Sequence, residues 1–150
     1  ACLDANMGLL PWSPLGGGWL TGKCRRDTTP TGATRLGENP NRGQESYAQR
    51  NASERVWGII AALETVAGAR GVSMAEVALA WVCGRPAVTS VILGARTPEQ
   101  LAQNLKADGL QLAPEEVAKL DAASAPVMGD YPYGPGGSKQ RTRPLAGGRA

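Results

Sequence analysis

The sequence predicts an α/β fold in which helices connect two buried parallel strands. Two short apolar segments, residues 8–12 and 88–93, are typical of buried strands. Four segments with helix-capping residues lie between and after them. Strands that are separated by helices indicate a parallel sheet. Because two strands do not form a stable sheet by themselves, we expect missing sequence or a partner to supply the others.

The two strands differ in how clearly the sequence marks them. The first, residues 8–12, is apolar and ends at the turn residues that begin with Ser13. The second, residues 88–93, is continuous and rich in β-branched side chains, which favour strands. Residues 16–51 are rich in Gly, Pro, Thr, Asn and Arg without a sustained period. A loop of that length in a compact domain is expected to be functional.

Capping residues mark the ends of the four helices. The first spans residues 53–71, with Ser53 as its N-cap and a glycine at its end. A capping box opens the second, at residues 73–84. The third, residues 97–108, begins with Thr-Pro-Glu-Gln, and the fourth, residues 113–123, begins with Pro and two acidic residues.

The composition excludes several classes of enzyme site. The 150 residues are enough for one domain, and 42% of them are apolar. The chain has no His, which rules out His bases, His metal ligands and Ser-His-Asp or Cys-His nucleophile systems. Its three cysteines have no CxxC spacing, so we expect free thiols and no metal site. No apolar run has the length of a membrane span and no signal peptide precedes the domain, so we expect a cytoplasmic protein.

The positive charge is concentrated at the C-terminal end. The net charge is +3, and four basic residues lie in the last dozen positions, which leaves the rest of the chain near neutral. We therefore expect no nucleic-acid surface on the folded part. Residues 1–125 are predicted to form the domain, and residues 126–150 a flexible basic tail rich in Gly and Pro.

A glycine-rich segment resembles a phosphate-binding P-loop only in part. Residues 17–23 match G-x-x-x-x-G-K, but Cys24 stands where the Ser or Thr that ligates magnesium should be. A P-loop also runs directly into a helix, whereas charged residues and Pro follow here. We interpret the segment as a glycine-rich turn in which a ligand could approach the backbone closely.

The junction of the second strand with the third helix is a candidate phosphate site. A helix N-terminus presents unpaired N–H groups, and Arg96 adds a guanidinium beside it. The amide of Asn104, two turns further along, could pair with the edge of an adenine. The alternative is that Arg96 is a solvated loop residue and Asn104 an exposed polar residue of the helix.

Two motifs in order resemble the aldo-keto reductase family. Residues 11–23 (PWSPLGGGWLTGK) are similar to the segment that closes the family's seventh strand. Residues 91–105 (VILGARTPEQLAQNL) are similar to its eighth-strand loop and helix. The resemblance covers roughly residues 3–125 and points to the subgroup of potassium-channel β subunits and bacterial general-stress reductases. It implies the C-terminal portion of a (β/α)8 barrel, incomplete, with about two parallel strands plus four helices.

The family binds NADPH in an extended conformation, so the resemblance implies a cofactor site. Residues that match the family's pyrophosphate, ribose and loop contacts are Ser13, Pro14, Leu15, Gly17, Lys23 and Arg35. Residues that match its contacts with the 2′-phosphate and the adenine are Gly94, Arg96, Gln100, Gln103 and Asn104. Trp12 either stacks on the nicotinamide or belongs to the core.

The resemblance implies reduction of aldehydes or ketones by hydride transfer from NADPH. The family's catalytic Asp, Tyr, Lys and His lie on earlier strands, so we expect none in this chain and no activity from it alone. The expected partners are a small carbonyl substrate and either a further copy or a complementing N-terminal half, with no nucleic acid or membrane. The alternatives are a nucleotide-binding regulatory subunit of the channel-β type and a scaffold that binds nucleic acid through its basic tail.

Overall fold

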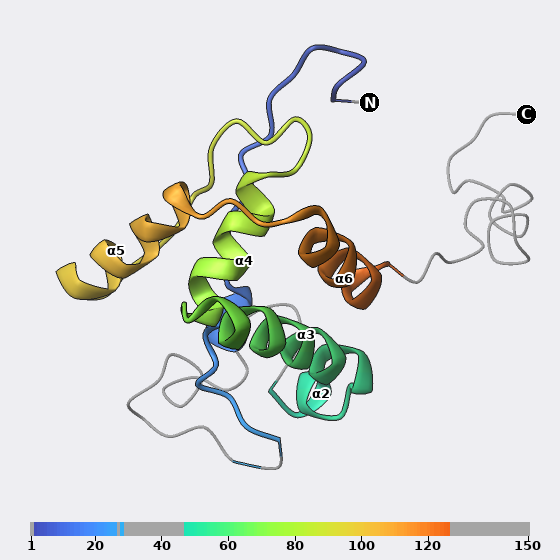
Figure 1. Cartoon of the computed structure of the whole chain (residues 1–150), viewed down its shortest axis with the longest axis vertical. Coiled ribbons are helices and arrows are strands. Elements are labelled where there is room, and N and C mark those ends of the chain that lie inside the picture. Colours follow the sequence, from blue (N-terminus) through green and yellow to red (C-terminus); the bar gives the residue numbers. More distant parts are fainter. Residues whose placement is uncertain (1, 27, 29–46, 127–150) are drawn as a thin grey trace, which may run out of the picture.

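The computed structural model describes residues 2–26, 28 and 47–126, and within them the chain is helical (Figure 1). A 3₁₀ helix, η1, comes first and is followed by the short helix α2. The long helices α3 and α4 come next, and α5, η2 and α6 complete the order. Their bounds are η1 (Gly16–Thr21), α2 (Tyr47–Asn51), α3 (Glu54–Arg70), α4 (Met74–Cys83), α5 (Pro98–Leu105), η2 (Lys106–Gly109) and α6 (Pro114–Ser124).

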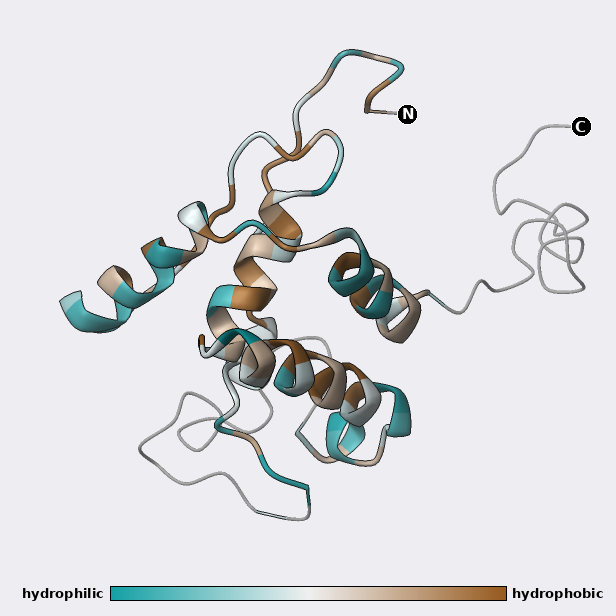
Figure 2. Cartoon of the chain, in the orientation of Figure 1, coloured by the Kyte–Doolittle hydropathy of each residue, from teal (hydrophilic) through white to brown (hydrophobic). Residues whose placement is uncertain are grey.

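The core lies where α3 packs against α4 and α6. Val77 and Leu79 of α4 are almost completely buried, and Leu63 and Val66 of α3 and Leu120 of α6 are at most 5% exposed. Apolar colour is concentrated on α3 and α4 in Figure 2, whereas α5 is mostly hydrophilic. In Figure 1, α5 extends away from the α3–α4–α6 core, and its contacts are with α4 and η2.

All four predicted helices are present, and their capping residues act as expected. The hydroxyl of Ser53 accepts from the N–H of Val56, and Gly71 ends α3 in the left-handed conformation. Ser73 and Glu76 form the predicted capping box of α4. The third helix ends earlier than predicted, because α5 stops at Leu105 and a 3₁₀ turn follows.

The prediction of two regular strands is wrong for these segments. They meet only in isolated parallel bridges, Leu9 with Val88 and Trp12 with Ile92. The parallel direction is as predicted, but the ladder does not continue. Pro11 has no N–H to donate, and within the described part of the chain the two segments pair only with each other, which is marginal for a sheet.

The expectation of an irregular loop over residues 16–51 is wrong at both ends, which are helical. Trp19 of η1 is 2% exposed and stacks on the ring of Tyr47 in α2, with 5.1 Å between centroids. Trp57 of α3 meets Trp19 edge-on at 5.7 Å. These aromatic contacts organise the two ends, and the surrounding glycines and polar residues hide them in the sequence. The middle of the loop, with Arg35, lies outside the described residues, as does the tail over residues 127–150.

Among the described residues, no single helix is long and apolar enough to cross a membrane. The helices α3 and α4 reach that length and apolarity only when taken together, and they meet at a bend of 102°. Nowhere in the described part of the chain do three or more His, Cys, Asp or Glu side chains gather where they could hold a metal ion.

Candidate functional site

The bridge between Trp12 and Ile92 brings together the two loops that the sequence predicts to contact a ligand. The N–H of Ile92 donates to the carbonyl of Pro11 at 2.9 Å, and the two segments run parallel. Because parallel segments leave a sheet at the same edge, residues 13–18 and 94–97 both begin there. In α/β barrels this carboxyl edge carries the binding loops.

The first loop is a turn with an unusual run of left-handed backbone. Ser13, Gly16, Gly17 and Gly18 have φ values of 55°, 59°, 73° and 107°. Residues with side chains rarely adopt this region, which is why glycines occur here. A Cβ added at Gly17 or Gly18 would meet nothing within 4 Å. The glycine turn (residues 13–18) therefore has open space against its backbone, as a ligand that approaches closely would need.

Hydrogen bonds within the glycine turn and from neighbouring side chains stabilise its conformation. Within it, the N–H of Gly16 donates to the carbonyl of Ser13 at 2.9 Å and that of Gly18 to Leu15 at 3.0 Å. The hydroxyl of Thr21 donates to the carbonyl of Gly18 at 2.6 Å. The guanidinium of Arg50 in α2 donates to the carbonyl of Gly16 at 2.8 Å. Sequence reasoning missed Arg50, because no local signal links it to a glycine 34 positions earlier.

The second loop is an ordered helix start. Thr97 caps α5 by accepting from the N–H of Gln100 at 3.3 Å. The side-chain oxygen of Gln100 accepts from the backbone N–H of Arg96 at 3.0 Å, which ties the loop to the helix. Hydrogen bonds from its own N–H and from Thr97 lower the pKa of Glu99, so this carboxylate is ionised at neutral pH. A phosphate at this turn would meet the positive charge of Arg96 and the negative charge of Glu99.

The predicted site residues differ in how accessible they are. The exposed ones are Ser13, Lys23, Gly94, Arg96 and Gln103. The half-buried ones are Pro14, Leu15, Gly17 and Gln100. Trp12 is 73% exposed, so the alternative that it belongs to the core is wrong for this structure. The binding roles of all these residues stay predictions.

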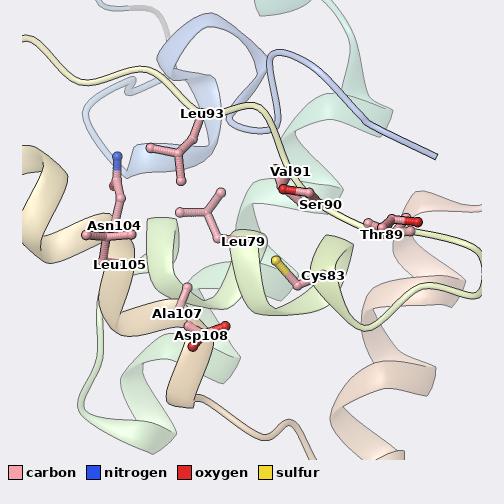
Figure 3. A pocket seen from close by; sticks show the side chains of 11 residues that line it. Leu79, Cys83, Thr89, Ser90, Val91, Leu93, Asn104, Leu105, Ala107 and Asp108 are labelled. Carbon is pink, nitrogen blue, oxygen red and sulfur yellow. The ribbon is translucent and has the colours of Figure 1, made fainter. Parts of the chain in front are cut away.

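Asn104 is buried, which makes the alternative of an exposed helix residue wrong. The exposed fraction of Asn104 is 8%. Its side chain lines a cavity of about 510 Å³ (Figure 3). The walls of this cavity come from α4, from residues 88–93, and from α5 and η2. Leu79 and Leu93 line the same cavity beside it. Burial, and then the negative charge of Asp108, raise the pKa of Cys83 at the cavity wall, so this thiol is protonated at neutral pH. The lining of the cavity is apolar near Asn104, and Asp108 supplies its negative charge.

The sequence is similar to oxidoreductases and channel subunits. The family described as "Aldo/keto reductase family" matches residues 1–125. A probable voltage-gated potassium channel subunit beta of Oryza sativa is 36% identical over 119 residues, 78% of this chain and 35% of that protein. Versiconal hemiacetal acetate reductase of Aspergillus parasiticus is 30% identical over 125 residues, 83% of this chain and 34% of that protein.

A solved structure shares the fold. Glycerol dehydrogenase AKR11B4 from Gluconobacter oxydans superposes on this chain with a TM-score of 0.60 at 26% sequence identity. The superposition covers 85% of this chain and 38% of the dehydrogenase chain. That likeness is consistent with part of a (β/α)8 barrel. The chain spans about a third of the length of the relatives it matches. With a family match over residues 1–125, the chain belongs to the aldo/keto reductase family.

Proposed function

We propose that this chain carries part of the cofactor site of an NADPH-dependent aldo-keto reductase that reduces aldehydes or ketones by hydride transfer. The observation that carries the proposal is the parallel pairing of Trp12 with Ile92, because the glycine turn and the Arg96 loop both begin at that edge. Relatives named as a hemiacetal acetate reductase and a glycerol dehydrogenase support oxidoreductase chemistry on small carbonyl or alcohol compounds.

The geometry fits an extended dinucleotide. The open space against the backbone of Gly17 and Gly18 suits a pyrophosphate. Arg96 and Gly94, in the loop that precedes α5, would meet the 2′-phosphate. When bound, NADPH supplies the hydride. The remaining residues proposed to border it are Ser13, Pro14, Leu15, Lys23, Arg35, Gln100, Gln103 and Asn104.

Coenzyme titration tests this proposal. Binding of NADPH and NADH to the 150-residue chain is followed by nicotinamide fluorescence, and we expect micromolar affinity with a preference for NADPH. Arg96→Ala should weaken NADPH binding by about tenfold and leave NADH unchanged, because only NADPH has the 2′-phosphate. The matched control is Arg55→Ala, an exposed arginine that donates to the carbonyl of Ser124 at 2.6 Å. Equal affinity of the wild-type chain for both coenzymes would contradict the role of Arg96.

We also propose that the chain has no reductase activity by itself. The resemblance implies that the family's catalytic residues lie on earlier strands, and the chain spans about a third of the length of its relatives. Leu10, Trp12 and Ile92 are 57%, 73% and 56% exposed, a surface that a complementing N-terminal half or a second copy would cover. Turnover of an aldehyde with NADPH by the purified chain, at rates typical of enzymes, would contradict this proposal.

A second candidate function is a nucleotide-binding regulatory subunit. It is favoured by the 36% identity to a probable potassium channel subunit beta. If NADPH binds and a complementing N-terminal half restores no turnover, this function is preferred over the reductase. The location we propose is the cytoplasm, since Cys2, Cys24 and Cys83 are all free thiols.

A further inference from the structure

Arg50 joins a helix to the glycine turn across a long stretch of sequence. Its Nη1 atom donates to the carbonyl of Gly16 at 2.8 Å, and the contact is partly buried. A Cβ built on Gly16 would lie 3.8 Å from the same nitrogen, so the guanidinium packs against the left-handed backbone. Gly16 begins η1, immediately before the two glycines with open space beside them.

The helix that carries Arg50 is held at both ends. At its start, Tyr47 stacks on the buried Trp19 and its hydroxyl donates to the carbonyl of Thr28. At its end, the carbonyl of Asn51 accepts from the indole N–H of Trp57 at 2.7 Å. Trp57 is itself 8% exposed in the core. The backbone at Arg50 is therefore fixed by groups other than its own side chain.

We propose that Arg50 is a positioning residue for the pyrophosphate of the nicotinamide coenzyme, an inference that rests on the proposed function. A carbonyl oxygen that points toward a phosphate repels it, so a turn that binds phosphate needs its carbonyls held away and compensated. In this turn, Arg50 and Thr21 engage the carbonyls of Gly16 and Gly18 from the protein side. Arg50 therefore keeps the peptide planes in the orientation that leaves the open side to the ligand.

The pyrophosphate is common to NADPH and NADH, whereas the 2′-phosphate distinguishes them. Loss of Arg50 should therefore weaken both coenzymes equally, unlike loss of Arg96.

The experiment compares Kd values of NADPH and NADH for the wild-type 150-residue chain and for Arg50→Gln, Arg50→Lys and Arg55→Gln. Arg50→Gln should weaken both coenzymes by about tenfold, the effect of one hydrogen bond to a charged group. Arg50→Lys keeps the charge and one donor, and should recover most of the affinity. Arg55→Gln, which removes a similar arginine–carbonyl bond at the end of α6, should change neither Kd.

Adenosine 2′-monophosphate separates positioning from a general loss of structure. It has the 2′-phosphate but no phosphate at the 5′ position, so its affinity should hold in Arg50→Gln, whereas a partly unfolded variant would lose it too. Wild-type Kd values in Arg50→Gln, or equal losses for the monophosphate and NADPH, would overturn the role of Arg50. A wild-type chain that binds neither coenzyme would instead refute the proposed function.

Discussion

Gly8 is the residue on which the approach of the two extended segments depends. A Cβ at this position would overlap Thr89 Oγ1 and lie 3.1 Å from Thr89 Cβ. Thr is β-branched, so rotating its side chain brings a methyl group into the same space. The neighbouring N–H of Leu9 donates to the carbonyl of Ala87 at 2.6 Å. Only a glycine allows this separation between the two backbones.

Gly8→Ala should therefore open the pairing at Leu9 without unfolding the helical core. We expect a cost of about 1–3 kcal/mol locally, as for other overpacked sites. Amide hydrogen exchange checks this, because the N–H groups of Leu9 and Thr89 should lose protection while those of α3 keep theirs. Adding Thr89→Ala should restore part of the protection, and unchanged exchange in Gly8→Ala would contradict the close contact.

The carboxylate of Glu116 ties α6 to α3 and makes stability depend on pH. Arg70 donates to it from Nε at 2.7 Å and from Nη2 at 2.5 Å, and the N–H of Ala113 donates at 2.7 Å. These bonds, that from Arg70 above all, lower the pKa of Glu116 from 4.5 to about 2. The pKa of Glu116 is lower in the folded protein than in the unfolded chain. The stabilisation is therefore complete above about pH 4.5 and is lost as the pH falls toward 2.

Glu116→Gln should lower the Tm by a few degrees at pH 7 and have almost no effect near pH 2. Thermal unfolding followed by circular dichroism at both pH values measures this difference. The matched control is Glu115→Gln, an exposed acid in the same first turn, whose effect should be smaller at pH 7. A Tm difference for Glu116→Gln that stays constant over the whole range would contradict the ion pair with Arg70.

At the scale of the element, α4 begins with a complete capping box. Ser73 donates from its hydroxyl to Glu76 at 2.6 Å and from its backbone N–H at 2.9 Å, and the N–H of Glu76 donates back at 3.2 Å. Glu76 is 8% exposed, so it depends on these partners. The hydrogen bonds from Ser73 outweigh burial and lower the pKa of Glu76.

Ser73→Ala should cost about 2 kcal/mol, because it removes the N-cap bond and leaves a buried carboxylate with fewer donors. Urea unfolding measures this cost. Ser53→Ala at the start of α3 is the comparison, since its bond to Val56 is longer, at 3.4 Å, and leaves no buried charge behind. We expect at most about 1 kcal/mol there. Equal costs at both caps would contradict a special role for Glu76.

At the scale of the whole molecule, the helical core provides the stability, and the proposed cofactor site lies at the edge beside it. The core joins α3, α4, α6 and η1 through residues that are almost fully buried. The paired segments that carry the glycine turn and the Arg96 loop instead present exposed Leu10, Trp12 and Ile92. We therefore expect the core to fold even where no further strand covers the paired segments.

Leu63→Ala should destabilise the whole chain by about 2–5 kcal/mol, since Leu63 is 3% exposed at the centre of the core. Leu101→Ala in α5, where the side chain is 42% exposed, should cost less than about 1 kcal/mol. Urea unfolding with an unchanged m value measures both. Similar costs for the two variants would mean that α5 is part of the same core, contrary to the observed packing.

The helices were predictable because their signals are local. Ser53, Gly71, Ser73 and Thr97 each satisfy a backbone group within four residues of themselves, so the sequence alone marks the ends of α3, α4 and α5. The strands were not predictable in the same way. A strand requires a neighbour along its length, and between these two described segments only two isolated bridges form.

The sequence by itself determined the four main helices, the two candidate binding loops and the family, because capping residues and motifs act over short distances. Only the tertiary structure decided that Trp19 and Asn104 are buried, that Trp12 is exposed, and that Arg50 meets Gly16. Such contacts depend on how distant elements pack. The interaction between a side chain and a backbone carbonyl 34 positions away leaves no pattern that a window of neighbouring residues could contain.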